Sequence, residues 1–130
     1  MYALDTNTLI FFFKGAGDVA RNLLAVPPSE IAIPSLVIHE LEVGIAKSVQ
    51  PAKRRTQLET LIASITILDF DLSAARAAAE IHVKLEKAGV KIGPMDTLIA
   101  GTALAHDATL VTHNQGEFTR VAGLKLVDWY

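Results

Sequence analysis

The amino-terminal stretch Tyr2-Ala3-Leu4-Asp5-Thr6-Asn7 begins with a short apolar run, which ends at the acid Asp5. Such a run followed by polar residues is typical of a short buried strand, so the sequence predicts a first strand over Tyr2–Leu4 with Asp5 at its carboxyl end. A helix should follow over Leu9–Lys14, with Asn7 or Thr8 as its cap.

The same alternation of short apolar runs and amphipathic segments continues to the end of the chain. Further strands are expected over residues 31–33, 65–70, 108–112 and 124–127, and helices over 18–25, 35–45, 51–64, 74–85 and 94–106. The helix over 74–85 places its apolar residues on one face. This order predicts an α/β fold of three layers, α/β/α, around a central, mostly parallel sheet of four to five strands.

The composition is that of a folded domain, and we expect one domain over residues 1–130. The chain has a mass of 14.0 kDa, is 51% apolar and contains no cysteine. Disulfides, thiolate nucleophiles and cysteine-based metal sites are therefore excluded. The longest stretch without formal charge, residues 97–106, is too short to span a bilayer. The first residues lack a basic segment followed by an apolar one, so we expect a cytoplasmic protein without a secretory signal.

The charge balance restricts how the chain could bind nucleic acid. Twelve Lys and Arg residues against 14 Asp and Glu residues give a net charge of −2 and an isoelectric point near 6.0. A protein held on nucleic acid by phosphate contacts alone usually has a basic excess. A metal ion or a local basic patch would have to supply the missing positive charge. The one tight basic cluster, Lys53-Arg54-Arg55, is a candidate for such a patch, although a run of this kind is usually just a solvated helix face.

Four acids fall where the expected strands end, and the carboxyl ends of parallel strands are where sites form in open α/β sheets. They are Asp5, Glu40, Asp96 and Glu117. A purely structural role is open for some of them, because Asp5 could cap a helix and Asp96 could complement a helix dipole.

The surroundings of two of these acids favour a specific role. Glu40 shares its helix face with Val37 and Gly44, and an acid on a stripe that is expected to be buried is costly unless it is paired or bound to a metal. Gly44, one turn further on, would leave room for a ligand. Asp96 opens a helix that is otherwise nearly uncharged, so its carboxylate should face something specific.

Four carboxylates in one place would repel one another and raise their own pKa values. A hard divalent cation such as Mg²⁺ or Mn²⁺ would relieve this repulsion, since such ions prefer oxygen ligands. The same ion could bind a phosphodiester and activate water. The acids therefore favour metal-dependent hydrolysis of a phosphodiester.

Four segments in register across the chain resemble a known family. They are Leu4-Asp5-Thr6-Asn7, Glu40-Leu41-Glu42-Val43-Gly44-Ile45, Met95-Asp96-Thr97-Leu98-Ile99-Ala100 and Leu110-Val111-Thr112-His113-Asn114-Gln115-Gly116-Glu117-Phe118. In this order and spacing they resemble the PIN domain, and more narrowly the VapC-type toxins of toxin–antitoxin pairs.

The resemblance implies a metal-dependent endoribonuclease with Mg²⁺, or Mn²⁺, held by Asp5, Glu40, Asp96 and Glu117. Relatives often have Asp at the last position, so Glu117 departs from the pattern and could act directly or through water. Supporting roles are implied for four polar neighbours, Thr6, Asn7, Thr112 and Asn114. The resemblance also implies an RNA substrate with initiator tRNA as a candidate, a homodimer, and a VapB-type antitoxin that forms a heterotetramer or larger assembly with it.

Two other functions are open at this point. Asp5-Thr6-Asn7-Thr8 partly matches the signature of HAD-like phosphatases, but Asn7 stands where those enzymes need a second Asp. A catalytically silent PIN-like binding module would have the same fold, although all four acidic positions of this chain carry carboxylates.

Overall fold

The computed structural model describes residues 1–130 and consists of a five-stranded sheet with helices on both sides. The strands are β1 (Tyr2–Leu4), β2 (Ile31–Pro34), β3 (Thr66–Leu68), β4 (Thr109–Val111) and β5 (Leu126–Val127). The helices are α1 (Thr6–Lys14), α2 (Val19–Leu24), α3 (Ser35–Ala46), α4 (Pro51–Ile62), α5 (Leu72–Lys87), α6 (Pro94–Ala105) and α7 (Gln115–Phe118), with a 3-10 turn at Pro28–Glu30.

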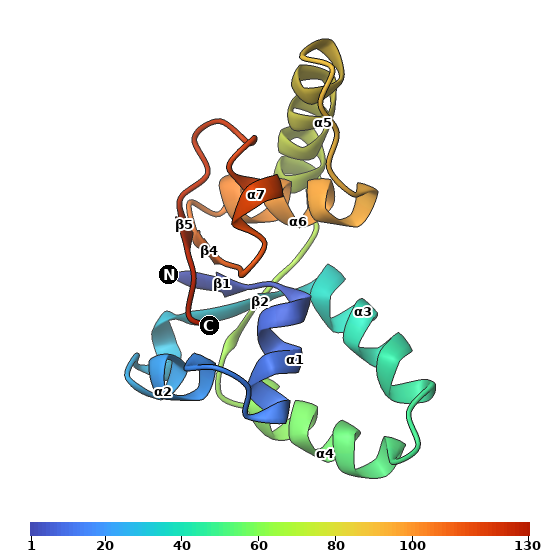
Figure 1. Cartoon of the computed structure of the whole chain (residues 1–130), viewed down its shortest axis with the longest axis vertical. Coiled ribbons are helices and arrows are strands. Elements are labelled where there is room, and N and C mark those ends of the chain that lie inside the picture. The colour runs from blue at the N-terminus through green and yellow to red at the C-terminus, as the bar shows by residue number, and fades with distance from the viewer.

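All neighbouring strands are parallel, and their order is β3-β2-β1-β4-β5. In Figure 1, helices α5, α6 and α7 lie on one side of the sheet and α1, α2 and α4 on the other. The predicted three-layer α/β fold with a mostly parallel sheet is thus confirmed, and the sheet is parallel throughout.

The central strands are buried because both faces of the sheet are covered. Ala3, Leu4, Ile33, Leu110 and Val111 are all fully buried. Continuous apolar strands of this kind are what a parallel sheet between two helical layers requires. Since β1 lies in the middle of the sheet, Asp5 at its carboxyl end is placed at the centre of one edge.

Helices α5 and α6 pack with their backbones almost in contact. A Cβ atom at Gly101 in α6 would lie 2.7 Å from the Cβ and backbone N atoms of Ala78 in α5. The stripe that the sequence predicted on α5 is buried at Ala74, Ala78, Ile81 and Leu85. This contact fixes α6, whose first turn carries Asp96.

The start of the first helix was predicted wrongly. Helix α1 begins at Thr6, and its cap is Asp5, not Asn7 or Thr8. The Asp5 carboxylate accepts a hydrogen bond from the backbone N–H of Thr8 at 2.9 Å, which satisfies one of the free donors at the helix start. The structural role of Asp5 and its place at the strand end therefore coincide.

Other differences concern the ends and one short element. Strands β3, β4 and β5 are shorter than expected, and several helices differ from the predicted ranges by one to three residues. Helix α7 was not predicted, because four residues including Gly116 carry no periodic signal. No helix combines the length and the apolar character that crossing a membrane would need.

Candidate acidic active site

Four elements bring Asp5, Glu40, Asp96 and Glu117 to the carboxyl edge of the central strands. Asp5 directly follows β1, and its backbone N–H donates to the carbonyl of Val111 at the end of β4, 3.1 Å away. Glu40 lies on α3 after β2, Asp96 in the first turn of α6, and Glu117 on α7 after β4. Crossover connections between parallel strands thus collect residues that are far apart in the sequence.

The four acids are close enough to affect one another. The pKa of Asp96 is raised from 3.8 to about 7, first because burial removes water from its carboxylate. The neighbouring carboxyl of Glu117, within hydrogen-bonding reach of Asp96, adds to this rise, and the charges of Asp5 and Glu40 contribute further. Near neutral pH, Asp96 therefore holds a proton for part of the time.

Asp5 is the most buried of the four, with 5% of its surface exposed. Burial raises the pKa of its carboxyl, and the charge of Glu40 adds to the effect. Hydrogen bonds from Thr112 and Thr8 act in the opposite direction and stabilise the ionised form. Asp5 is thus a buried acid that the fold keeps in place through specific polar partners.

Polar neighbours orient the two glutamates. The Thr6 hydroxyl donates to Oε1 of Glu40 at 2.6 Å. The Asn114 side-chain amide donates to Oε2 of Glu117 at 2.8 Å. Both donors are among the residues for which the sequence predicted a supporting role.

The two remaining supporting residues differ. Thr112 is fully buried. Its hydroxyl oxygen accepts a hydrogen bond from the backbone N–H of Asn114, with 3.0 Å between the two heavy atoms, and this bond shapes the loop before α7. Asn7 is exposed, and its side chain is not hydrogen-bonded to any of the four acids. Three of the four predicted supporting residues therefore contact the acids or the loop that carries them.

The environment of Glu40 differs from the prediction. Its helix does bury Val37, Leu41 and Ile45, but Glu40 is half-buried and Gly44 is exposed. No atom lies within 4 Å of where a Cβ of Gly44 would be. The expected space beside Glu40 exists, but it is an open groove and not a buried stripe.

The donor set suits a hard divalent cation in kind, because it offers only carboxylate oxygens and an excess of negative charge. As the side chains lie, however, no three His, Asp or Glu residues are arranged to hold one metal ion. The structure places the four acids at one edge with mutual repulsion, and the shared ion that the sequence predicted stays a prediction.

Comparison with known proteins identifies the family. The family model of the PIN domain matches residues 2–124. This chain belongs to the PIN-domain family.

Among curated PIN-domain relatives, the tRNA(fMet)-specific endonuclease VapC of Salmonella typhimurium is 34% identical over 98% of this chain and 97% of its own length. Ribonuclease VapC2 of Rickettsia felis is 35% identical over 99% of this chain and 98% of its own. The predicted resemblance to VapC-type proteins is therefore confirmed over the whole chain.

Solved PIN-domain structures agree with the fold. VapBC2 from Rickettsia felis bound to a DNA fragment from its promoter matches with a TM-score of 0.92 at 34% identity, covering 99% of this chain and 98% of that one. DNA-bound VapBC from Salmonella typhimurium matches with the same TM-score, identity and coverage. Membership of this family leaves the phosphatase alternative without support.

Proposed function

We propose that this PIN domain is a VapC-type toxin, an endoribonuclease that hydrolyses phosphodiester bonds in RNA with the help of a divalent metal ion, Mg²⁺ or Mn²⁺. The observation that carries the proposal is the meeting of four carboxylates, from four separate segments, at the carboxyl edge of the central strands. The ribonuclease names of full-length relatives support it.

In this proposal, Asp5 and Asp96 are the principal metal-binding residues, and Glu40 and Glu117 complete the site directly or through water. A bound cation would lower the pKa of water and stabilise the charge that develops on the phosphate. Thr6 and Asn114 would keep Glu40 and Glu117 oriented through their hydrogen bonds. Hydrogen bonds from Thr112 and Thr8 would offset part of the rise that burial causes in the pKa of Asp5, and so favour the ionised form that binds a cation.

The substrate and partners follow from the relatives. The Salmonella relative is named for its action on tRNA(fMet), so initiator tRNA is the first candidate substrate, and cleavage would arrest translation in the cytoplasm. The solved relatives are complexes of VapB and VapC. We therefore expect a VapB-type antitoxin as partner, a homodimer of this chain, and a heterotetramer or larger assembly of the two proteins.

The decisive experiment is cleavage of RNA by the purified protein with and without metal. We expect cleavage with Mg²⁺, its loss in EDTA, and its return when Mg²⁺ is restored. Asp96→Asn and Asp5→Asn should each lower the rate about 10³-fold, because an active-site cation contributes several kcal/mol to stabilising the transition state. Circular dichroism should show that both variants are folded.

Asp107→Asn is the matched control, since Asp107 is exposed and its carboxylate contacts only Lys125. It should cleave RNA like the unmodified protein. Cleavage that survives EDTA, or that persists in Asp96→Asn, would contradict the metal-dependent site. A folded protein that cleaves no RNA with any divalent ion would instead favour the silent binding module.

A further inference from the structure

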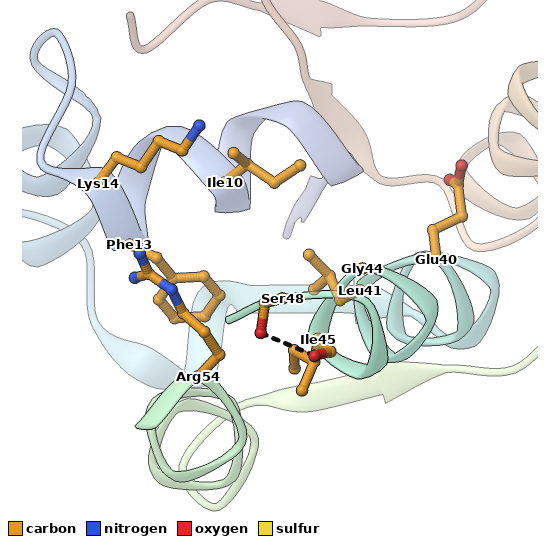
Figure 2. A pocket seen from close by; sticks show the side chains of 9 residues that line it. All are labelled: Ile10, Phe13, Lys14, Glu40, Leu41, Gly44, Ile45, Ser48 and Arg54. Atoms are coloured by element: carbon orange, nitrogen blue, oxygen red, sulfur yellow. Dashed lines mark hydrogen bonds between the residues drawn. The ribbon is translucent and has the colours of Figure 1, made fainter. Parts of the chain in front are cut away.

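A groove between α1, α3 and α4 begins at the acidic site and leads away from it. Glu40 lies at one end, and the apolar side chains of Ile10, Phe13, Leu41 and Ile45 form the walls (Figure 2). The cavity volume of this groove is about 190 Å³, less than the roughly 300 Å³ at which enclosed small-molecule sites begin, so it is a shallow groove that is open to solvent.

Two cationic side chains stand at the other end of this groove. Figure 2 shows Lys14 of α1 and Arg54 of α4 on the side away from Glu40. Neither forms an ion pair, and the only side-chain partner of Arg54 is the amide oxygen of Gln57, 3.1 Å from Nη1. The groove therefore offers two positive charges that no carboxylate of the chain neutralises.

The basic cluster that the sequence singled out is divided by the structure. Arg54 lines the groove, whereas Arg55 is paired with Glu42 at 3.4 Å and Lys53 is exposed outside the groove. One member of the cluster thus faces the groove, and it is joined there by Lys14 from a different helix.

Resting on the proposed ribonuclease function, we infer that this groove holds the single-stranded RNA on one side of the cleaved bond, with Lys14 and Arg54 binding its phosphates and Phe13 contacting a base. A metal ion at the acids would serve only the phosphate that reacts, so the next phosphates need cations from the protein. In a chain of net charge −2, these two unpaired cations in the groove that begins at Glu40 meet that need.

The combination of cations and apolar walls favours an unpaired strand. Proteins that bind single strands place basic side chains along the backbone and aromatic or apolar surfaces against the bases. A base inside a duplex is stacked and cannot reach such walls. The groove is also continuous with Glu40, so a strand whose phosphate lies at the acids is led directly into it.

The first test removes the two charges. Lys14→Ala/Arg54→Ala is compared with Lys53→Ala/Lys87→Ala, which loses the same charge at exposed positions outside the groove. Binding of a single-stranded RNA oligonucleotide is measured at several salt concentrations, with Asp96→Asn in both proteins to prevent cleavage. We expect the groove variant to bind at least about tenfold more weakly. Its plot of log affinity against log salt should be shallower by about 1.4, since each phosphate contact on a single strand contributes about 0.7.

The second test fills the groove without harming the helix. Gly44→Leu adds a side chain where no atom lies within 4 Å, and Ala46→Leu adds a similar one on the same helix at an exposed position outside the groove. Both should fold. Only Gly44→Leu should raise the KM for RNA about tenfold or more, with kcat changed much less, because the acids themselves are untouched.

The outcomes separate this inference from the proposed function. If the unmodified chain cleaves RNA with Mg²⁺ but both groove variants match their controls, the groove does not bind RNA and the inference is overturned while the function stands. Unchanged RNA binding together with loss of a bound antitoxin would assign the groove to a protein partner and overturn it as well. If Lys14→Arg/Arg54→Lys binds RNA as tightly as the unmodified chain, the result would support the inference, because it would show that positive charge at those two positions is what binds the RNA.

Discussion

The α5–α6 contact and the groove between α1, α3 and α4 lie on opposite sides of the sheet, and each depends on a helical glycine. At Gly101 an added Cβ would lie 2.7 Å from the backbone of Ala78, whereas at Gly44 it would meet nothing within 4 Å. One glycine permits two helices to touch, and the other leaves a surface open. The tight contact fixes the helix that carries Asp96, and the open surface begins at Glu40. The site thus combines a rigid support with an accessible approach, and substitutions at the two glycines should have opposite effects.

The largest effect is expected when the tight contact is broken. Gly101→Val should lower the free energy of unfolding by about 3 kcal/mol, because the helices must separate or the backbone of Ala78 must shift. Urea unfolding measures this. Cleavage by the protein that stays folded should also fall, since a displaced α6 moves Asp96, and misplacement by about 1 Å can cost about 10²-fold in rate.

The matched control is Gly44→Val, which makes the same substitution where there is space. It should change the free energy of unfolding by less than about 0.5 kcal/mol, as surface substitutions usually do. Equal losses at both positions would mean that valine in a helix, and not the α5–α6 contact, determines the result.

A smaller effect is expected from the hydrogen bond that orients Glu40. Thr6→Val removes the donor 2.6 Å from Oε1 of Glu40 and should lower cleavage about 10- to 100-fold, the usual cost of losing a residue that orients a metal ligand. Thr6→Ser should retain most of the activity. Thr60→Val, at an exposed hydroxyl that bonds only within α4, should leave cleavage unchanged. If Thr6→Val is as active as Thr60→Val, the hydrogen bond does not position the acid.

The acidic site should also make stability depend on pH, in contrast to the uncharged α5–α6 contact. Burial and the neighbouring acids raise the pKa of Asp96 from 3.8 to about 7. Between these values the folded protein holds a proton that the unfolded chain has released, so the free energy of unfolding should decrease as pH rises from about 4 to about 7. Because Asp96 is partly exposed, we expect a total of about 1 to 2 kcal/mol.

This contribution is measured as a difference between proteins without added metal. Urea unfolding of the unmodified chain and of Asp96→Asn at pH 4, 5.5 and 7 should converge at low pH, with Asp96→Asn more stable at pH 7. Asp107→Asn should follow the unmodified chain. A gap that is the same at every pH would show that the proton on Asp96 is not its cause.

The sequence predicted the sheet and the four acids because each has a local signal. The apolar strands are continuous, the acids follow their ends, and parallel strands bring their carboxyl ends to one edge. The stripe of α5 was equally visible, since Ala74, Ala78, Ile81 and Leu85 repeat with the period of a helix.

The sequence could not predict contacts that depend on how helices pack. The open space at Gly44 was predicted from the sequence, but nothing local in Gly101 shows that it touches Ala78 of α5. The pairing of Arg55 with Glu42, which leaves Arg54 for the groove, also depends on the position of α4 against α3. The role of Asp5 as a helix cap was weighed as an alternative to a place in the site, whereas the structure gives it both positions.

The smallest effect is expected at Gly44, the glycine that faces the open groove. Gly44→Ala should raise the free energy of unfolding by about 0.5 to 1 kcal/mol, because alanine loses less backbone freedom in a helix and its methyl group meets no other atom. Gly101→Ala has the same gain in helix propensity but places its methyl group against Ala78, so it should lower stability. Urea unfolding of the two variants beside the unmodified chain would show the opposite signs directly. If Gly44→Ala were destabilising, the groove would have to be closed in solution, and a glycine there would serve packing just as Gly101 does.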